Sequence, residues 1–149
     1  MRSKFTSQLF IGAAAVCLTL VVSGCKSDLP RGSVDGLVLV DNMPLEGLLI
    51  VYISKSNQGR SGRAQGMTDA AGRYVLRGED QRPGVPLGDY IVLIQDLEIY
   101  TAPRDADGTV VQRPPRRFPA AYEKVETTPL STSVANGHQS IDFKIVAAP

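Results

Sequence analysis

Short apolar runs separated by Gly, Pro and Asn fill most of the chain after Cys25. Several runs alternate apolar and polar residues and are rich in β-branched residues, which is typical of strands. We find no helical period after Cys25. The pattern predicts about seven strands, near residues 34–40, 48–53, 64–68, 73–76, 90–95, 129–135 and 140–146. This series of short strands with turn signals between them indicates an all-β chain folded as a single β-sandwich.

The predicted sandwich has a candidate core on the inward faces of its strands. Because side chains alternate across a strand, a slip of one residue would exchange the buried and exposed sets. The positions expected to be buried, or their direct neighbours, are Val38, Val40, Ile50, Tyr52, Val75, Ile91, Leu93, Ile141 and Phe143.

Three Gly-containing segments predict turns. In Thr68–Leu76 (TDAAGRYVL), Asp69 can cap its own backbone and Gly72 can take positive φ. A calcium loop is the alternative, but it needs more alternating oxygen ligands and a late Glu. Asp105–Gly108 (DADG) leaves the same two interpretations open, and we favour a flexible turn. Asn136–Gly137 predicts a hairpin turn between the last two strands.

The N-terminus resembles a secretion signal. Arg2 and Lys4 precede an apolar run over residues 9–22, which is too short for an ordinary membrane-spanning helix. Residues 20–25 (LVVSGC) resemble a bacterial lipobox, and the resemblance implies diacylglycerol on the Cys25 thiol, cleavage before Cys25 and acylation of its new amino group. The alternative is a plain signal peptide with an incidental Cys. We therefore expect a signal peptide over 1–24, a lipidated tether over 25–33 and a domain over 34–147.

The charge balance and the few Cys and His residues limit the kinds of partner and metal site that are possible. The 149 residues contain 16 Lys and Arg against 15 Asp and Glu, and removal of residues 1–24 takes away Arg2 and Lys4, which leaves a formal charge of −1. No basic face for nucleic acid is implied. Cleavage also removes Cys17, so Cys25 would be the single remaining Cys beside a single His, His138. A disulfide and a Cys/His zinc cluster are excluded from the mature chain, and we expect no cofactor.

The order of the motifs resembles a known family. The matching segments are Gly36–Gly47 (GLVLVDNMPLEG), Leu49–Ile53, Thr68–Leu76 and Val85–Ile94 (VPLGDYIVLI). Together they resemble the carboxypeptidase regulatory-like domain, a transthyretin-like Greek-key sandwich, with Asp41-Asn42 in place of the usual Asp-Gly. The segments Pro119–Tyr122, Thr128–Leu130 and Asp142–Ile145 resemble the tails of small bacterial lipoproteins built on this domain. The resemblance implies a fold and a location, and it carries over no catalytic residue.

The most distinctive candidate surface is the segment Arg113–Pro119 (RPPRRFP). One interpretation is a docking strip for a partner, in which Arg113, Arg116 and Arg117 bind carboxylate or phosphate and Phe118 is an anchor. An acidic lipid headgroup, an anionic polysaccharide or an envelope protein would fit it. The alternative, which we favour, is a proline-stiffened loop with Phe118 and Tyr122 packed on the sandwich, because large aromatics are usually buried. A partner could also add a strand at a sheet edge.

Function follows from these patterns as an expectation. His138 lies at a predicted turn, and no Gly-x-Ser-x-Gly elbow is present, so we expect no enzyme. The expected protein is a lipid-anchored binding or structural module of the cell envelope. Lys26 follows Cys25 where an Asp would resemble an inner-membrane retention signal, which favours the outer membrane. The alternatives are a carbohydrate-binding protein, favoured if Tyr100, Phe118 and Tyr122 were exposed, or a small envelope hydrolase that depends on His138.

Overall fold

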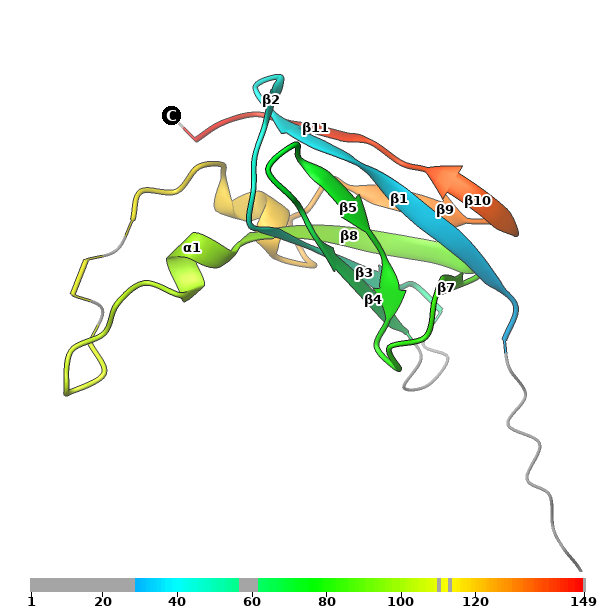
Figure 1. The fold of residues 1–149 in the computed structure, drawn as a ribbon, viewed down its shortest axis with the longest axis horizontal. Helices are drawn as coiled ribbons and strands as arrows, with labels where there is room; N and C mark the ends of the chain where they lie inside the picture. Colours follow the sequence, from blue (N-terminus) through cyan, green and yellow to red (C-terminus); the bar gives the residue numbers. More distant parts are fainter. Residues whose placement is uncertain (1–28, 57–61, 110, 113, 149) are drawn as a thin grey trace, which may run out of the picture.

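The chain folds as an all-β sandwich, as the strand pattern predicts (Figure 1). A computed structural model describes residues 29–56, 62–109, 111–112 and 114–148. No helix within these ranges is long and apolar enough to cross a membrane. The strands are β1 Arg31–Val40, β2 Met43–Pro44, β3 Leu48–Ser54, β4 Arg63–Met67, β5 Arg73–Val75, β6 Arg77–Gly78, β7 Val85–Pro86, β8 Gly88–Asp96, β9 Ser131–Val134, β10 Gly137–Ser140 and β11 Phe143–Ile145. Two short helical turns, α1 Leu97–Tyr100 and η2 Ala120–Glu123, separate β8 from β9.

Strand β1 is the shared partner of every other strand in one sheet. It pairs antiparallel with β2, β5 and β7 along one side and parallel with β10 and β11 along the other. The second sheet has the antiparallel order β6-β4-β3-β8-β9. β1 begins at Arg31, so residues 31–33, which were expected in the tether, are part of the sheet because Gly32 pairs with both Val85 and Gly137.

The chain crosses between the two sheets on both sides of the sandwich. β4 pairs with β3, whereas β5, which follows it after one turn, pairs with β1. On the other side β9 pairs with β8, and β10 pairs with β1. The predicted hairpin at Asn136–Gly137 is therefore wrong: the segment joins two sheets, and its positive φ at Gly137 turns the chain from one layer to the other.

The predicted core is largely correct, with errors of register on β5 and on β8, where Tyr90, Val92 and Ile94 rather than Ile91 and Leu93 belong to the core cluster. Val38, Val40, Ile50, Tyr52, Leu93 and Phe143 are buried. Ile91 and Ile141 are partly exposed, and their neighbours Tyr90 and Val92 fill the core beside Ile91. Val75 is 62% exposed, while its neighbours Tyr74 and Leu76 are buried, because β5 pairs Tyr74 with Gly36 and Val75 with Asp35.

The turn between β4 and β5 forms as predicted. One carboxylate oxygen of Asp69, Oδ1, accepts hydrogen bonds from the backbone N–H groups of Ala71 and Arg73, each at 2.9 Å. Gly72 has a φ of 72°, a conformation that costs glycine little. The carboxylate thus serves the backbone of the turn, which is the role that the sequence pattern favours for Asp69.

Buried tyrosines connect the two sheets through the core. The hydroxyl of Tyr74 on β5 donates to the carbonyl oxygen of Ile141 at 2.6 Å, and the hydroxyls of Tyr74 and Tyr52 lie 3.2 Å apart. Since Tyr74 gives its only proton to Ile141, Tyr52 on β3 must donate to Tyr74. The chain of bonds therefore runs from one sheet, through the other, to the segment between β10 and β11.

This buried network predicts a loss of stability at alkaline pH. Burial raises the pKa of Tyr52 to about 12 and raises the pKa of Tyr74 as well. Both phenols ionise near their usual pKa in the unfolded chain, so the stabilisation is complete below about pH 10 and is lost as pH rises through the folded pKa. Each tyrosine would contribute a slope of about 1.4 kcal/mol per pH unit in that window.

Urea unfolding of two variants between pH 8 and pH 11.5 checks this prediction. Tyr52→Phe removes a buried phenol, and Tyr100→Phe, at an exposed tyrosine, is the control. We expect Tyr52→Phe to cost about 1 kcal/mol at pH 8 and to flatten the alkaline decline. An equal decline in both variants would contradict the assignment.

Candidate functional site

A long excursion between β8 and η2 is the most prominent feature outside the sandwich. Residues 97–116, here called the projecting loop, carry α1 and extend away from the sheets (Figure 1). Its two arms are joined by backbone bonds from Asp105 N–H to Thr109 O at 2.9 Å and from Val111 N–H to Pro103 O at 3.0 Å. The projecting loop is thus a hairpin-like arm with internal structure.

The turn at the end of this arm repeats the turn between β4 and β5. Oδ1 of Asp105 accepts from the N–H groups of Asp107 at 3.1 Å and Thr109 at 2.8 Å, and Gly108 has a φ of 79°. The same bonds, at the same offsets, surround Asp69. The interpretation of Asp105–Gly108 as a turn is therefore confirmed, and within the described residues no group of three or more His, Cys, Asp or Glu residues could hold a metal ion.

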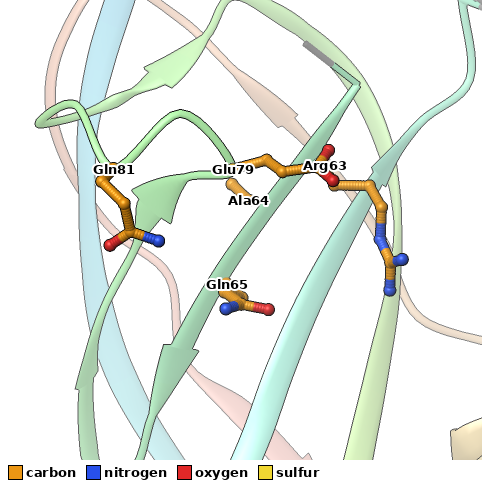
Figure 2. A pocket seen from close by; sticks show the side chains of 5 residues that line it. All are labelled: Arg63, Ala64, Gln65, Glu79 and Gln81. Atoms are coloured by element: carbon orange, nitrogen blue, oxygen red, sulfur yellow. The ribbon is translucent and has the colours of Figure 1, made fainter. Parts of the chain in front are cut away.

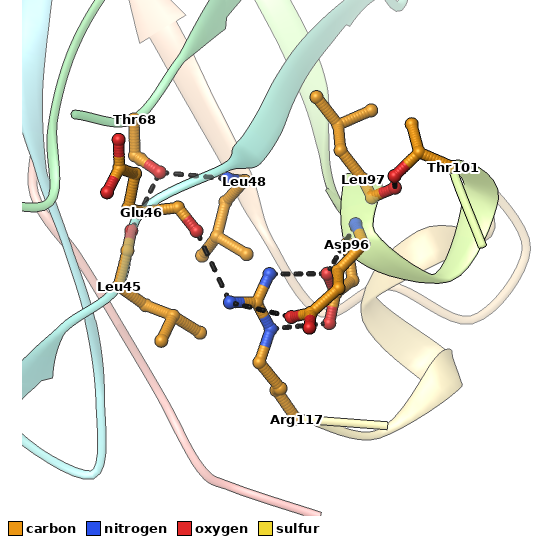
Figure 3. Close-up of polar contacts among 9 residues, drawn as sticks. Leu45, Glu46, Leu48, Thr68, Asp96, Leu97, Thr101 and Arg117 are labelled. Atoms are coloured by element: carbon orange, nitrogen blue, oxygen red, sulfur yellow. Dashed lines mark hydrogen bonds and ion pairs between the residues drawn. The ribbon is translucent and has the colours of Figure 1, made fainter. Parts of the chain in front are cut away.

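A buried ion pair closes the base of the projecting loop. Asp96 ends β8 and is 1% exposed, and Arg117 follows the last residue of the loop (Figure 3). Arg117 Nε donates to Asp96 Oδ2 at 2.7 Å, and Arg117 Nη2 donates to Asp96 Oδ1, a bidentate arrangement. These bonds hold the pKa of Arg117 above its usual value, so the pair stays charged. The Asp96–Arg117 pair, here called the clamp, fixes both ends of the loop to the sheet.

Backbone groups complete the surroundings of the clamp. Arg117 Nη1 donates to the carbonyl of Glu46 at 3.3 Å, and the N–H of Glu98 donates to Asp96 Oδ1 at 3.1 Å. Near Glu46, the Thr68 hydroxyl donates to Leu45 O at 2.7 Å and accepts from the N–H of Leu48, which orders the segment between β2 and β3 (Figure 3). The clamp therefore joins the projecting loop to the end of the sandwich.

Arg116 makes a second ion pair beside the clamp. Its Nη1 lies 2.7 Å from Oε2 of Glu123 on η2, and the side chain of Glu123 is 6% exposed. Oε1 of Glu123 is buried and has no hydrogen-bond partner among the described residues. An ordered water is the usual partner of such an atom.

The structure separates the residues of the predicted docking strip. Phe118 is 1% exposed and belongs to the core cluster, with its ring centroid 6.3 Å from that of Tyr122. It is therefore not available on the surface as an anchor, and the packed-loop alternative describes its position. Arg116 and Arg117 hold buried carboxylates, and Arg113 lies outside the described residues, as does Cys25.

The exposed apolar groups of the projecting loop lie beyond the clamp, within the loop itself. Tyr100 is 53% exposed and Val111 is 66% exposed. A shallow hollow of about 330 Å³ lies between α1 and the proline segment, and it is lined by Glu98, Thr101, Ala102, Pro103, Gln112, Pro114 and Pro115. No local signal in the sequence indicates the pairing of Arg117 with Asp96, because 21 residues separate the two.

A hollow of about 430 Å³ on the outer face of the six-stranded sheet contains His138. Its Nε2 lies 3.5 Å from Oδ2 of Asp35, and its side chain is 62% exposed, as expected, although it lies on β10 and not at a hairpin turn. Ser140 lies opposite Asp35 on the neighbouring strand. A catalytic base needs an oriented and partly desolvated imidazole, and the exposed pair is instead an ordinary surface interaction worth about 0–1 kcal/mol.

The remaining surfaces have a smaller hollow and only short edge strands. A hollow of about 280 Å³ at the β4–β6 edge is lined by Arg63, Ala64, Gln65, Glu79 and Gln81, and the labelled polar side chains there spread apart (Figure 2). The outer strands of the five-stranded sheet, β6 and β9, have two and four residues. Such short edges limit strand addition. Of the aromatic residues considered for a glycan, Tyr100 is exposed, whereas Phe118 is buried and Tyr122 is partly buried.

Comparison of the chain with protein-family models, curated proteins and solved structures found no match. The site is therefore described from its own geometry.

The clamp predicts a specific cost of mutation. Arg117→Met would leave the buried carboxylate of Asp96 without its partner, and we expect a loss of about 3–5 kcal/mol in the free energy of unfolding. Arg104→Met changes an exposed Arg of the same loop, whose Nη1 donates to Gly108 O, and should stay within about 0.5 kcal/mol. Urea unfolding of the two variants compares them directly. Similar small losses in both would show that the clamp does not hold the loop.

Proposed function

We propose that this protein is a non-catalytic binding module of the cell envelope, anchored to the membrane by lipid on Cys25, which contacts its partner through the projecting loop. The clamp is the observation that carries the proposal. A 20-residue excursion that served only as a connection would need no buried bidentate ion pair at its base. Long loops on a rigid scaffold are common binding elements, because the scaffold fixes their position.

The position of the loop supports an outward-facing role. β1 starts at Arg31, close in sequence to Cys25, and runs toward the end of the sandwich from which the projecting loop extends (Figure 1). Ten residues of strand span about 33 Å. A lipid at Cys25 would therefore hold the near end of the sandwich at the membrane and leave the loop on the far side, accessible to an envelope protein.

The exposed side chains of the loop suit a protein partner. Tyr100 and Val111 are apolar contact groups, and the prolines Pro103, Pro114 and Pro115 restrict the backbone before binding. Restricting a loop before it binds lowers the entropy lost on association. These features favour a protein partner over a glycan, for which a row of exposed aromatic rings would be expected.

The anchor is tested by metabolic labelling. Cells that express the full chain are grown with a clickable palmitate analogue, and Cys25→Ala is compared with Cys17→Ala. We expect labelling of the wild type and of Cys17→Ala, and neither labelling nor cleavage of Cys25→Ala. Label on Cys25→Ala, or none on the wild type, would contradict lipidation at this residue.

The contact surface is tested by cross-linking in intact cells. A photoreactive residue replaces Tyr100 on the loop, and a matched one replaces Val75, which is exposed on the opposite sheet. We expect one protein to be captured at position 100 and not at position 75. Adding Arg117→Lys, which keeps the charge but not the bidentate geometry, should reduce that capture severalfold. Equal capture at both positions, or capture unaffected by Arg117→Lys, would contradict a role for the clamped loop.

A further inference from the structure

The end of the sandwich where β1 starts carries an exposed apolar pair. Leu29 is 42% exposed and Leu87 is 36% exposed. The two segments are adjacent, because the N–H of Leu87 donates to the carbonyl of Pro30 at 3.1 Å. Pro30 itself is exposed as well. An apolar surface thus lies where the described chain continues toward Cys25, and we call this end the near pole.

Charged residues, with basic ones in slight excess, lie in the segments next to the apolar pair at the near pole. Lys55 lies beside it, since its N–H donates to Asp89 O at 2.8 Å, two residues after Leu87. Arg31 forms an ion pair with Asp80 at 2.5 Å, and Arg82 lies 3.7 Å from the same carboxylate. The described charged residues of ranges 29–33, 54–56, 62–63, 78–89 and 135–138 are Arg31, Lys55, Arg63 and Arg82 against Glu79, Asp80 and Asp89.

The opposite end, here called the far pole, has the reverse balance. It comprises the turns 41–47 and 68–72 and the segment 96–128, which the clamp and neighbouring bonds hold together. Its described acidic residues are Asp41, Glu46, Asp69, Asp96, Glu98, Asp105, Asp107, Glu123 and Glu126, and its described basic residues are Arg104, Arg116, Arg117 and Lys124. Among the described residues, the near pole is therefore net basic by one charge and the far pole is net acidic by five.

The length of the tether keeps the near pole at the membrane. Leu29 is the fourth residue after Cys25 in sequence. At about 3.5 Å per residue, even an extended tether would place Leu29 within roughly 14 Å of the lipidated Cys. A short tether raises the effective concentration of the bilayer at the near pole, so weak apolar and electrostatic contacts suffice to seat it.

We propose that the near pole rests directly on the bilayer, with Leu29 and Leu87 entering the interface and the surrounding basic side chains facing anionic headgroups. The acidic far pole is repelled by the same surface, so the charge distribution and the apolar pair favour one orientation. The inference rests on the proposed anchor at Cys25 and adds that the folded domain itself contacts lipid.

Tryptophan fluorescence tests the contact, because the chain contains no Trp. Cys25 is the only thiol in residues 25–149, and the core cluster lies within residues 34–145. A maleimide lipid can therefore be coupled to Cys25 of the purified 25–149 chain, whether or not cells lipidate it. Leu87→Trp probes the near pole, and Tyr100→Trp, at another exposed position, probes the far pole. Both are placed in anionic vesicles with lipids brominated on the acyl chains.

We expect bromine quenching of Leu87→Trp to exceed that of Tyr100→Trp by about twofold or more, since an inserted side chain reaches the acyl boundary. Adding Leu29→Glu to Leu87→Trp, or replacing the anionic lipid by a zwitterionic one, should reduce the difference. Equal quenching at the two positions would mean that the domain moves freely on its tether and would overturn the proposal. Leu87→Trp that is unquenched but protected from aqueous iodide would assign the surface to a second copy or another protein, which also overturns it.

The two proposals fail in different ways. Failure of palmitate labelling at Cys25 would remove the anchor in cells and leave the vesicle result intact. Absence of selective quenching would remove the direct contact with lipid and leave a lipid-anchored chain whose domain is held only by its tether.

Discussion

The hydrogen bonds of β1 are the constraint on which the rest of the structure depends. Five other strands pair with this one strand, three antiparallel and two parallel. Partners this close on both sides require backbone without side chains at some positions. A Cβ atom on Gly36 would lie 1.9 Å from the carbonyl oxygen of Ile141, and that oxygen is the acceptor for Tyr74. Gly36 therefore permits both the parallel pairing and the tyrosine network that joins the two sheets.

The sequence predicts the elements of this fold better than their partners. Alternating apolar residues located the main strands, and Asp69 with Gly72 located a turn, because these signals are local in the chain. The sequence does not show which residues of β5 face the core, since Tyr74 and Val75 both suit a strand. The pairing of β5 with β1 decides that Tyr74 is the buried one. The sheet that β9 or β10 joins is likewise set by contacts with distant strands.

The candidate site shows the same limit for charged residues. Arg116, Arg117 and Phe118 have the chemistry of a docking strip, but bidentate Arg pairing and a large aromatic ring also suit the interior of a protein. Asp96, which decides the role of Arg117, is 21 residues away in sequence, and no local pattern links the two. The sequence could show only that this segment is unusually rich in Arg and Pro. The structure was needed to show that Arg117 pairs with the buried Asp96, that Phe118 is in the core, and that Tyr100 and Val111 are the exposed groups of the loop.

The two ends of β1 relate the fold to its proposed place in the envelope. The strand starts beside Leu29, Leu87 and a slight excess of basic residues, and it ends near the clamped loop and most of the acidic residues. Charges of opposite sign at opposite ends of a rigid body give it a preferred orientation at an anionic surface, even when each charge contributes little. The clamp joins the loop to the end of β8 and to the carbonyl of Glu46, and the tyrosine network joins the two sheets. Under the proposed function, a partner would meet the loop on the side of the sandwich away from the membrane, and the packing at the base of the loop would set where that contact is made.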